Sequence, residues 1–138
     1  MHKFLLLTCL ICFMSMVALA DETVETCAGG GGTIVIGAVT KYKYCKSNNS
    51  MNWWNAVSWC DAQKKELFTL DDCARNVTTS YWHCPELVLG NRFEAWTYNF
   101  YGSTSSPQTH KIYTDTGTIR TGTDGINHRN HGGHAVCK

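Results

Sequence analysis

One stretch of the chain has the hydrophobic spacing of an amphipathic α-helix. Trp53, Ala56, Val57 and Cys60 lie at positions i, i+3, i+4 and i+7, a spacing that places them along one face of a helix. Asn52, immediately before them, is a residue type that caps helix N-termini. The pattern therefore predicts one main helix that begins after Asn52 and buries this face.

Stretches rich in β-branched and aromatic residues predict strands on both sides of this helix. The predicted strands are residues 33–44 (one or two strands), 92–101, 111–113, 117–121 and 135–137. The turn residues at 115–117 join two of them into a hairpin. Residues 71–90 show no clear period and predict an irregular loop with a short helical turn. The order of these elements is typical of an α+β domain.

The first twenty residues have the layout of a cleavable secretory signal. His2 and Lys3 precede an almost wholly apolar run, and Ala18 and Ala20 provide the small residues required at a cleavage site. We expect residues 1–20 to be removed, which leaves Asp21 as the first mature residue. Residues 21–40 contain four consecutive glycines and predict an N-terminal extension with a Gly-rich linker, the alternative for the glycines being a turn.

The cysteine content points to an exported protein stabilised by disulfides. The chain has 138 residues, enough for one domain, and eight cysteines. Six cysteines remain after the signal: Cys27, Cys45, Cys60, Cys73, Cys84 and Cys137. They predict three disulfides, with fifteen connectivities open. Because no C-x-x-C pair occurs among them, a zinc site is disfavoured. The expected location is secreted or extracytoplasmic, in a periplasm or at a cell surface.

The charge pattern excludes several classes of partner. The formal net charge is +1, and the mature chain has eleven basic and eleven acidic residues. Since neither a basic patch nor a basic stripe is visible, we expect no nucleic-acid partner. No segment after the signal is apolar for long enough to span a bilayer, so we expect that the protein is not an integral membrane protein. We expect no cofactor, and the oligomeric state stays open.

The stretch 51–60, followed by Leu67 and Leu70, resembles the first helix of C-type-lectin-like domains. The family pattern is M-[ST]-W-x-x-A-x-x-x-C-x-x-x-G-x-x-L-x-x-[IL], and this chain departs from it at Asn52 and Lys64. Residues 96–97, 112–119 and 135–138 resemble later family strands. The resemblance covers residues 41–138 and is closest to short bacterial secreted members. It implies a disulfide-stapled fold of small antiparallel sheets, one main helix and long irregular loops.

The resemblance also implies how the cysteines pair. In the family, the helix cysteine is bonded to the cysteine of the last strand, which corresponds here to Cys60 and Cys137. Cys73 and Cys84 would then close the middle loop, and Cys27 and Cys45 would fix the N-terminal strand.

The calcium-binding motifs of the sugar-binding members are missing. Neither Pro85 nor Pro107 stands within E-P-N or Q-P-D, and W-N-D does not precede Cys137. A calcium ion needs six to eight oxygen ligands, so the family's calcium-dependent sugar site is not supported.

Aromatic and polar residues in the loop-rich regions are the candidates for ligand binding, because loops carry recognition and aromatic rings stack on sugars and peptides. They are Trp82, Trp96, Tyr98, Tyr101, Asn127 and Arg129. The alternative for the aromatic residues is that they fill a small core.

Three histidines near the C-terminus are a weaker candidate site. His128, His131 and His134 could bind a metal ion, since neutral imidazoles bind zinc, copper or nickel. Gly132 and Gly133 argue against the helix that would bring the three together, so a solvated loop is favoured.

Catalytic motifs are poorly represented. Glu86 and Glu94 could act as paired carboxylates, or His83 as a base near Ser80, but no G-x-S-x-G nucleophile motif occurs. We therefore expect no enzyme. The sequence favours an exported recognition module for a glycan or protein ligand. The alternatives are a structural subunit of a pilus-like or envelope assembly and a His-rich metal binder.

Overall fold

The computed structural model describes residues 23–73, 83–101, 108–125 and 132–138. The helices and strands in these residues are β1 (Gly32–Ile36), β2 (Lys43–Ser47), α1 (Trp53–Ala62), η1 (Leu70–Asp72), η2 (Pro85–Leu87), β3 (Glu94–Tyr101), β4 (Gln108–Tyr113), β5 (Thr118–Gly125) and β6 (Val136–Cys137). Here η denotes a short 3-10 helix.

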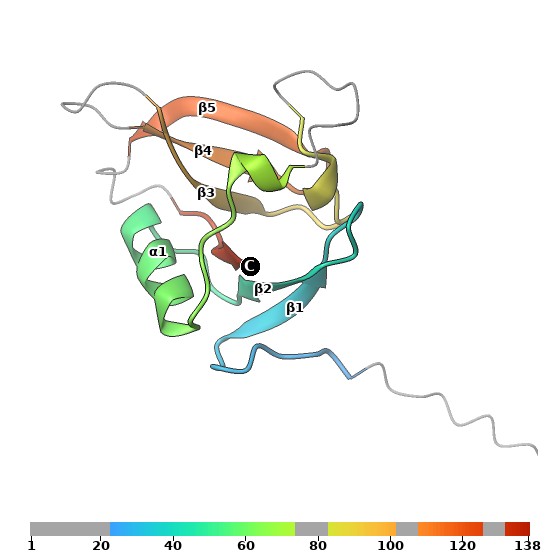
Figure 1. The fold of residues 1–138 in the computed structure, drawn as a ribbon. Coiled ribbons are helices and arrows are strands. Elements are labelled where there is room, and N and C mark those ends of the chain that lie inside the picture. The colour runs from blue at the N-terminus through green and yellow to red at the C-terminus, as the bar shows by residue number, and fades with distance from the viewer. Residues whose placement is uncertain (1–22, 74–82, 102–107, 126–131) are drawn as a thin grey trace, which may run out of the picture.

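The strands form two antiparallel three-stranded sheets. Their orders are β1–β2–β6 and β3–β4–β5. In Figure 1 the second sheet lies above the first, and α1 stands at one side. The predicted α+β class, with small antiparallel sheets and one main helix, is confirmed at this level of detail. Among the described residues, no helix combines the length and apolar character needed to cross a membrane.

The local signals at α1 act as the sequence predicted. The side chain of Asn52 accepts a hydrogen bond from Asn55 N at 2.8 Å and caps the first turn. Trp53, Ala56 and Cys60 are buried on the predicted face. Shortly after the helix, Lys64 takes φ +57°, a left-handed conformation in which chains commonly leave an α-helix.

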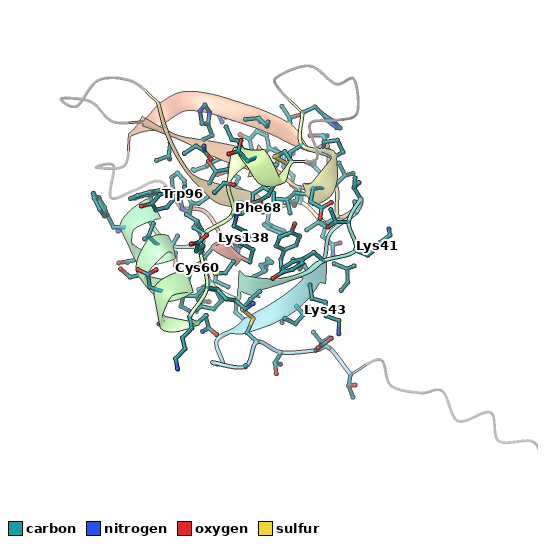
Figure 2. The ribbon with its side chains drawn as sticks, viewed as in Figure 1. Lys41, Lys43, Cys60, Phe68, Trp96 and Lys138 are labelled. Atoms are coloured by element: carbon teal, nitrogen blue, oxygen red, sulfur yellow. A yellow bond between two sulfur atoms is a disulfide. The ribbon has the colours of Figure 1, made fainter. Side chains whose placement is uncertain are left out.

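Three disulfides crosslink the chain. They join Cys27 to Cys45, Cys60 to Cys137 and Cys73 to Cys84, the pairs that the resemblance implied. Cys45 and Cys137 are opposite each other in the register of β2 and β6. The first two disulfides therefore meet at one strand pair and attach α1 and the N-terminal segment to it. Figure 2 labels Cys60, the cysteine of α1.

Two adjoining clusters of buried side chains form the core. The first contains Cys27, Cys45, Trp53, Ala56, Cys60, Leu67, Trp96, Ala135 and Cys137. The second contains Tyr44, Phe68, Leu70, Cys73, Cys84, Leu87, Ala95, Ile112, Ile119 and Val136. The consecutive residues Val136 and Cys137 belong to different clusters, because successive side chains of a strand point to opposite faces. The short strand β6 thus lies between the two halves of the core.

The segment around β1 is attached to the first sheet. β1 pairs with β2 along its whole length, so residues 32–36 belong to the sheet. The glycines before it form a turn, since Gly30 and Gly31 have φ values of +76° and +69°. The disulfide at Cys27 and the pairing of β1 together fix this segment to the domain.

A buried carboxylate fixes the turn between β1 and β2. Glu86 of η2 is fully buried, and its Oε2 accepts hydrogen bonds from Val39 N at 3.0 Å and Thr40 N at 2.9 Å. The Tyr44 hydroxyl donates to its Oε1 at 3.0 Å, and the Thr40 hydroxyl donates to the same atom. Burial and the hydrogen bond to Glu86 raise the pKa of Tyr44 above its ordinary value. Glu86 therefore joins η2 to the first hairpin.

Replacing Glu86→Ala should lower the free energy of unfolding by about 3 kcal/mol, because the buried Tyr44 hydroxyl and the donors of the turn would lose their acceptor. Urea denaturation of the oxidised protein measures the effect. Glu66→Ala is the control, since Glu66 is exposed and should change stability little. Equal stability of the two variants would show that the buried network does not hold the turn.

The two disulfides of unequal span should differ in their contribution. Cys60 and Cys137 are 77 positions apart, and Cys73 and Cys84 are 11 apart. Chain entropy then predicts about 4.5 kcal/mol lost in the Cys60→Ala, Cys137→Ala variant and about 3 kcal/mol in the Cys73→Ala, Cys84→Ala variant. Thermal and urea unfolding of the two double variants measure the difference, and a reversed order would contradict the prediction.

Candidate functional site

A groove between α1 and β3 contains one of the residues that the sequence singled out. It has a volume of about 300 Å³ and is called the Tyr98 groove below. Its lining residues are Val57, Asp61, Glu66, Leu67, Thr69 and Tyr98. The helix contributes one wall, the segment that follows the helix contributes the other, and β3 contributes Tyr98.

Tyr98 lies at the surface although its neighbours in β3 are buried. Its side chain is 48% exposed, whereas Trp96 and Thr97 are nearly or fully buried. The register between β3 and β4 shifts between Trp96 and Phe100, and such an irregularity breaks the simple alternation of side chains. The backbone N–H of Tyr98 donates to Phe68 O at 2.9 Å, which fixes β3 against the far wall of the groove.

An exposed aromatic surface adjoins this groove. The Tyr98 ring centroid is 5.8 Å from that of Trp53, and Trp53 is 5.0 Å from Trp54 in an edge-on arrangement. Trp53 itself is buried, and its indole N–H donates to Thr97 O at 2.9 Å. Trp54 is 53% exposed. The buried indole of Trp53 therefore packs against the exposed rings of Trp54 and Tyr98.

Trp96 does not have the ligand-binding placement that the sequence suggested. It is 1% exposed, and its indole N–H donates to Met51 O at 2.8 Å. Lys111 Nζ lies 4.5 Å from its ring centroid, and Gly133 packs so closely that a Cβ there would come within 2.9 Å of the indole nitrogen. Trp96 is therefore a core residue, which was the alternative considered for the aromatic candidates, because its ring is almost fully buried.

Several other candidates lie outside the described residues. These are Trp82, Asn127, Arg129, His128 and His131. Tyr101 is the last residue of β3, but its side chain is not among those described. The proposed contribution of these residues to a site therefore stays a prediction.

His134 is the one member of the histidine triplet in the described part of the chain. Its Nδ1 lies 2.8 Å from Ser47 O, and its ring contacts Phe93 edge-on at a centroid distance of 5.4 Å. Burial lowers the pKa of His134, the hydrogen bond to Ser47 raises it, and Lys46 lowers it further. No group of three potential metal ligands occurs within the described ranges.

The two carboxylates considered for catalysis have separate structural partners. Glu86 holds the first hairpin, as described above. Glu94 forms an ion pair with Lys111, with 3.0 Å between Oε2 and Nζ, and Lys111 Nζ also donates to Gly132 O at 3.1 Å. Each carboxylate is thus committed to a different segment of the fold.

A larger groove runs along β1. It has a volume of about 790 Å³ and is called the β1 groove below. Its lining residues are Thr33, Ile34, Val35, Ile36, Ala38, Lys41, Lys46, Val88, Leu89, Asn91, Arg92, Phe93 and His134. Among these residues, only His134 had been singled out from the sequence. The others were missed because the groove forms where residues 88–93 lie against the first sheet, which is a long-range contact.

The sequence also missed the polar wall of the Tyr98 groove. Asp61 and Glu66 had no signal that marked them, since a charged residue near a helix end is normally a solvated surface group. They approach Tyr98 because the segment after α1 runs back along β6, where Leu67 forms a bridge with Cys137. This pairing is a tertiary contact, which local sequence patterns do not predict.

The lowered pKa of His134 predicts a loss of stability in mild acid. The unfolded chain has a histidine pKa of about 6.5, so the unfolded state binds more protons than the native state below that pH. The stabilising contribution is complete above about pH 6.5 and is lost as the pH falls through the lowered native pKa.

Melting temperatures at pH 7.5 and pH 5.0 test this. The decrease should be smaller in His134→Asn, whose amide can still donate to Ser47 O, than in the natural protein. His83→Asn should leave the decrease unchanged. An unaltered pH response in His134→Asn would contradict the assignment.

Comparisons with known proteins assign no relative to this chain. No family model, no curated protein and no solved structure matches it. The geometry of the two grooves and the chemistry of the residues that line them are therefore the basis for the functional proposals.

Proposed function

We propose that the protein is an exported, non-catalytic recognition module that binds a glycan in the Tyr98 groove. The observation that carries this proposal is the exposed Tyr98 ring beside two carboxylates in one groove. An aromatic ring that is held at the surface offers an apolar face on which a sugar ring can stack. Ordered rings lose little conformational freedom on binding, which favours affinity.

The polar residues of the groove suit hydroxyl-rich ligands. The carboxylates of Asp61 and Glu66 accept hydrogen bonds when ionised, and Thr69 lines the same groove. The apolar base is formed by Val57 and Leu67. Sugars present several hydroxyl donors around an apolar ring face, so acceptors beside an aromatic ring complement them. The volume, about 300 Å³, is at the small end for ligand sites.

Three features support a C-type-lectin-like fold as part of the proposal. The cysteine of α1 is bonded to that of the last strand, as the resemblance implied. The first hairpin has its own disulfide, between Cys27 and Cys45. Lys64, which stands where the family pattern has glycine, has a left-handed φ of +57°, a conformation that glycine adopts most readily.

Export is supported by the disulfides and the sequence of residues 1–20. Three disulfides form and persist in oxidising compartments. The basic start, the apolar run and the small residues near position 20 are those of a secretory signal. The proposed location is therefore secreted or extracytoplasmic.

Replacing Tyr98→Ala should weaken glycan binding at least about tenfold, because the stacking face is lost at the centre of the groove. Tyr42→Ala is the matched control, since Tyr42 is 47% exposed and lies on the first hairpin. A printed glycan array identifies a ligand for the oxidised mature protein, and titration calorimetry then compares the variants.

Tyr98→Phe should retain most of the affinity, and EDTA should leave binding unchanged, since no calcium motif is present. Urea unfolding of each variant separates a lost ligand face from a lost fold. The proposal fails if no glycan binds, or if Tyr98→Ala and Tyr42→Ala bind equally well.

A further inference from the structure

β1 has an outer edge that is only partly paired. The strand is terminal in the order β1–β2–β6. Gly31 O accepts a hydrogen bond from Asn48 N, and Gly37 N donates one to Tyr42 O. Because the pattern alternates along a strand, the backbone groups of residues 33 and 35 also face β2 and those of residues 34 and 36 face outward. The backbone groups of Ile34 and Ile36 therefore point away from β2.

The chain itself shows that this edge accepts a strand. Cys27 N donates to Gly32 O at 3.0 Å, and Ile34 N donates to Glu25 O at 2.8 Å. Among the described residues, this antiparallel pairing extends no further toward the N-terminus than Glu25. Within the described residues, the carbonyl of Ile34 and the N–H of Ile36 have no backbone partner. Unpaired groups of this kind on an edge strand are a template for strand addition.

The β1 groove follows this edge. Four consecutive residues, Thr33 to Ile36, line it. Because successive side chains of a strand point to opposite faces, a groove that touches all four runs along the strand's edge, where the backbone is accessible. Ile36 is 45% exposed there, and Leu89 and Phe93 form an apolar wall opposite.

The groove is also strongly biased in charge. Lys41, Lys46 and Arg92 line it, and neither Asp nor Glu is among its lining residues. Lys46 is half-buried, with its Nζ 4.8 Å from the Phe93 ring centroid and 3.3 Å from Ser47 O. In the described part of the chain, Lys46 has no carboxylate partner. Arg92 has a 3.8 Å contact with Asp115, lies 5.5 Å from the Tyr113 ring centroid and is largely exposed. An anionic ligand would compensate these charges.

We propose that the β1 groove binds an extended acidic peptide segment that adds as a strand to the outer edge of β1. Main-chain hydrogen bonds to Ile34 and Ile36 would provide affinity, and alternate acidic side chains would face Lys46 and Arg92. A free anion or an acidic glycan would use the same cations but would not need the strand edge. This site is separate from the Tyr98 groove and does not depend on it.

The probe is an acetylated and amidated pentapeptide, Glu-Val-Glu-Val-Glu, whose binding is followed by fluorescence anisotropy at low salt. Lys46→Gln should weaken it about tenfold, because a partly desolvated ion pair is lost. Lys65→Gln, which removes a cation outside the groove, is the matched control. The neutral peptide Gln-Val-Gln-Val-Gln should bind weakly to every form of the protein.

Ile36→Pro tests the strand edge directly. Proline is tolerated on an edge strand where the N–H faces outward, so the variant should fold and bind the peptide about five- to tenfold more weakly. A backbone N-methylated Glu-Val-Glu-Val-Glu should lose affinity to a similar degree. Unchanged binding in both cases would overturn strand addition and leave a simple anion site, and absence of peptide binding would overturn the proposal altogether.

Tyr98→Ala separates this proposal from the glycan proposal. It should leave peptide binding unchanged, and Lys46→Gln should leave glycan binding unchanged. Loss of both activities in either variant would contradict the independence of the two grooves.

Discussion

Two disulfides meet at a single pair of residues, and the arrangement of the fold depends on this junction. Cys45 and Cys137 face each other across β2 and β6, and each is bonded to a further segment, Cys45 to Cys27 and Cys137 to Cys60. All four cysteines are buried. The N-terminal segment, the first hairpin, the helix and the C-terminal strand are thus held together by covalent bonds around one point. A small domain has limited apolar surface to bury, so such crosslinks substitute for part of a larger core.

Both grooves are consequences of this junction. The bond between Cys60 and Cys137 fixes α1 beside β6, and the segment after α1 pairs with β6 through Leu67. The Tyr98 groove is the space between α1 and the segment that follows it, next to Tyr98 of β3. On the other side, Cys27 and Cys45 hold the start of β1 against β2. The edge of β1 then runs under residues 88–93 and forms the β1 groove.

Buried polar groups set the relative positions of the two sheets. Glu86, in η2, accepts hydrogen bonds from the first hairpin. The indole N–H groups of Trp53 and Trp96 donate to backbone carbonyls across the first core cluster. A buried donor without an acceptor is costly, so these contacts favour one arrangement of the elements over others of equal apolar burial. Apolar contacts alone would be less selective, because they have no preferred direction.

The sequence determined the elements and much of the covalent framework. The helix followed from the spacing of Trp53, Ala56 and Cys60 and from the Asn52 cap, since both depend on residues within one or two turns. The later strands followed from composition and turn residues, and the disulfide pairs agreed with those implied by the resemblance. Tyr98 was singled out as an aromatic residue in the loop-rich half of the chain.

Only the tertiary structure decided how these residues are used. Trp96 and Tyr98 are two positions apart in one strand, yet Trp96 is buried in the core and Tyr98 lies at the surface. The reason is that the register of β3 shifts after Trp96 and that the two residues lie differently relative to α1. Asp61, Glu66 and the basic residues of the β1 groove are ordinary charged residues in the sequence. They line grooves because long-range pairing brings separate segments together. Local patterns specify which element a residue joins, whereas its neighbours across the fold depend on contacts that span the whole chain.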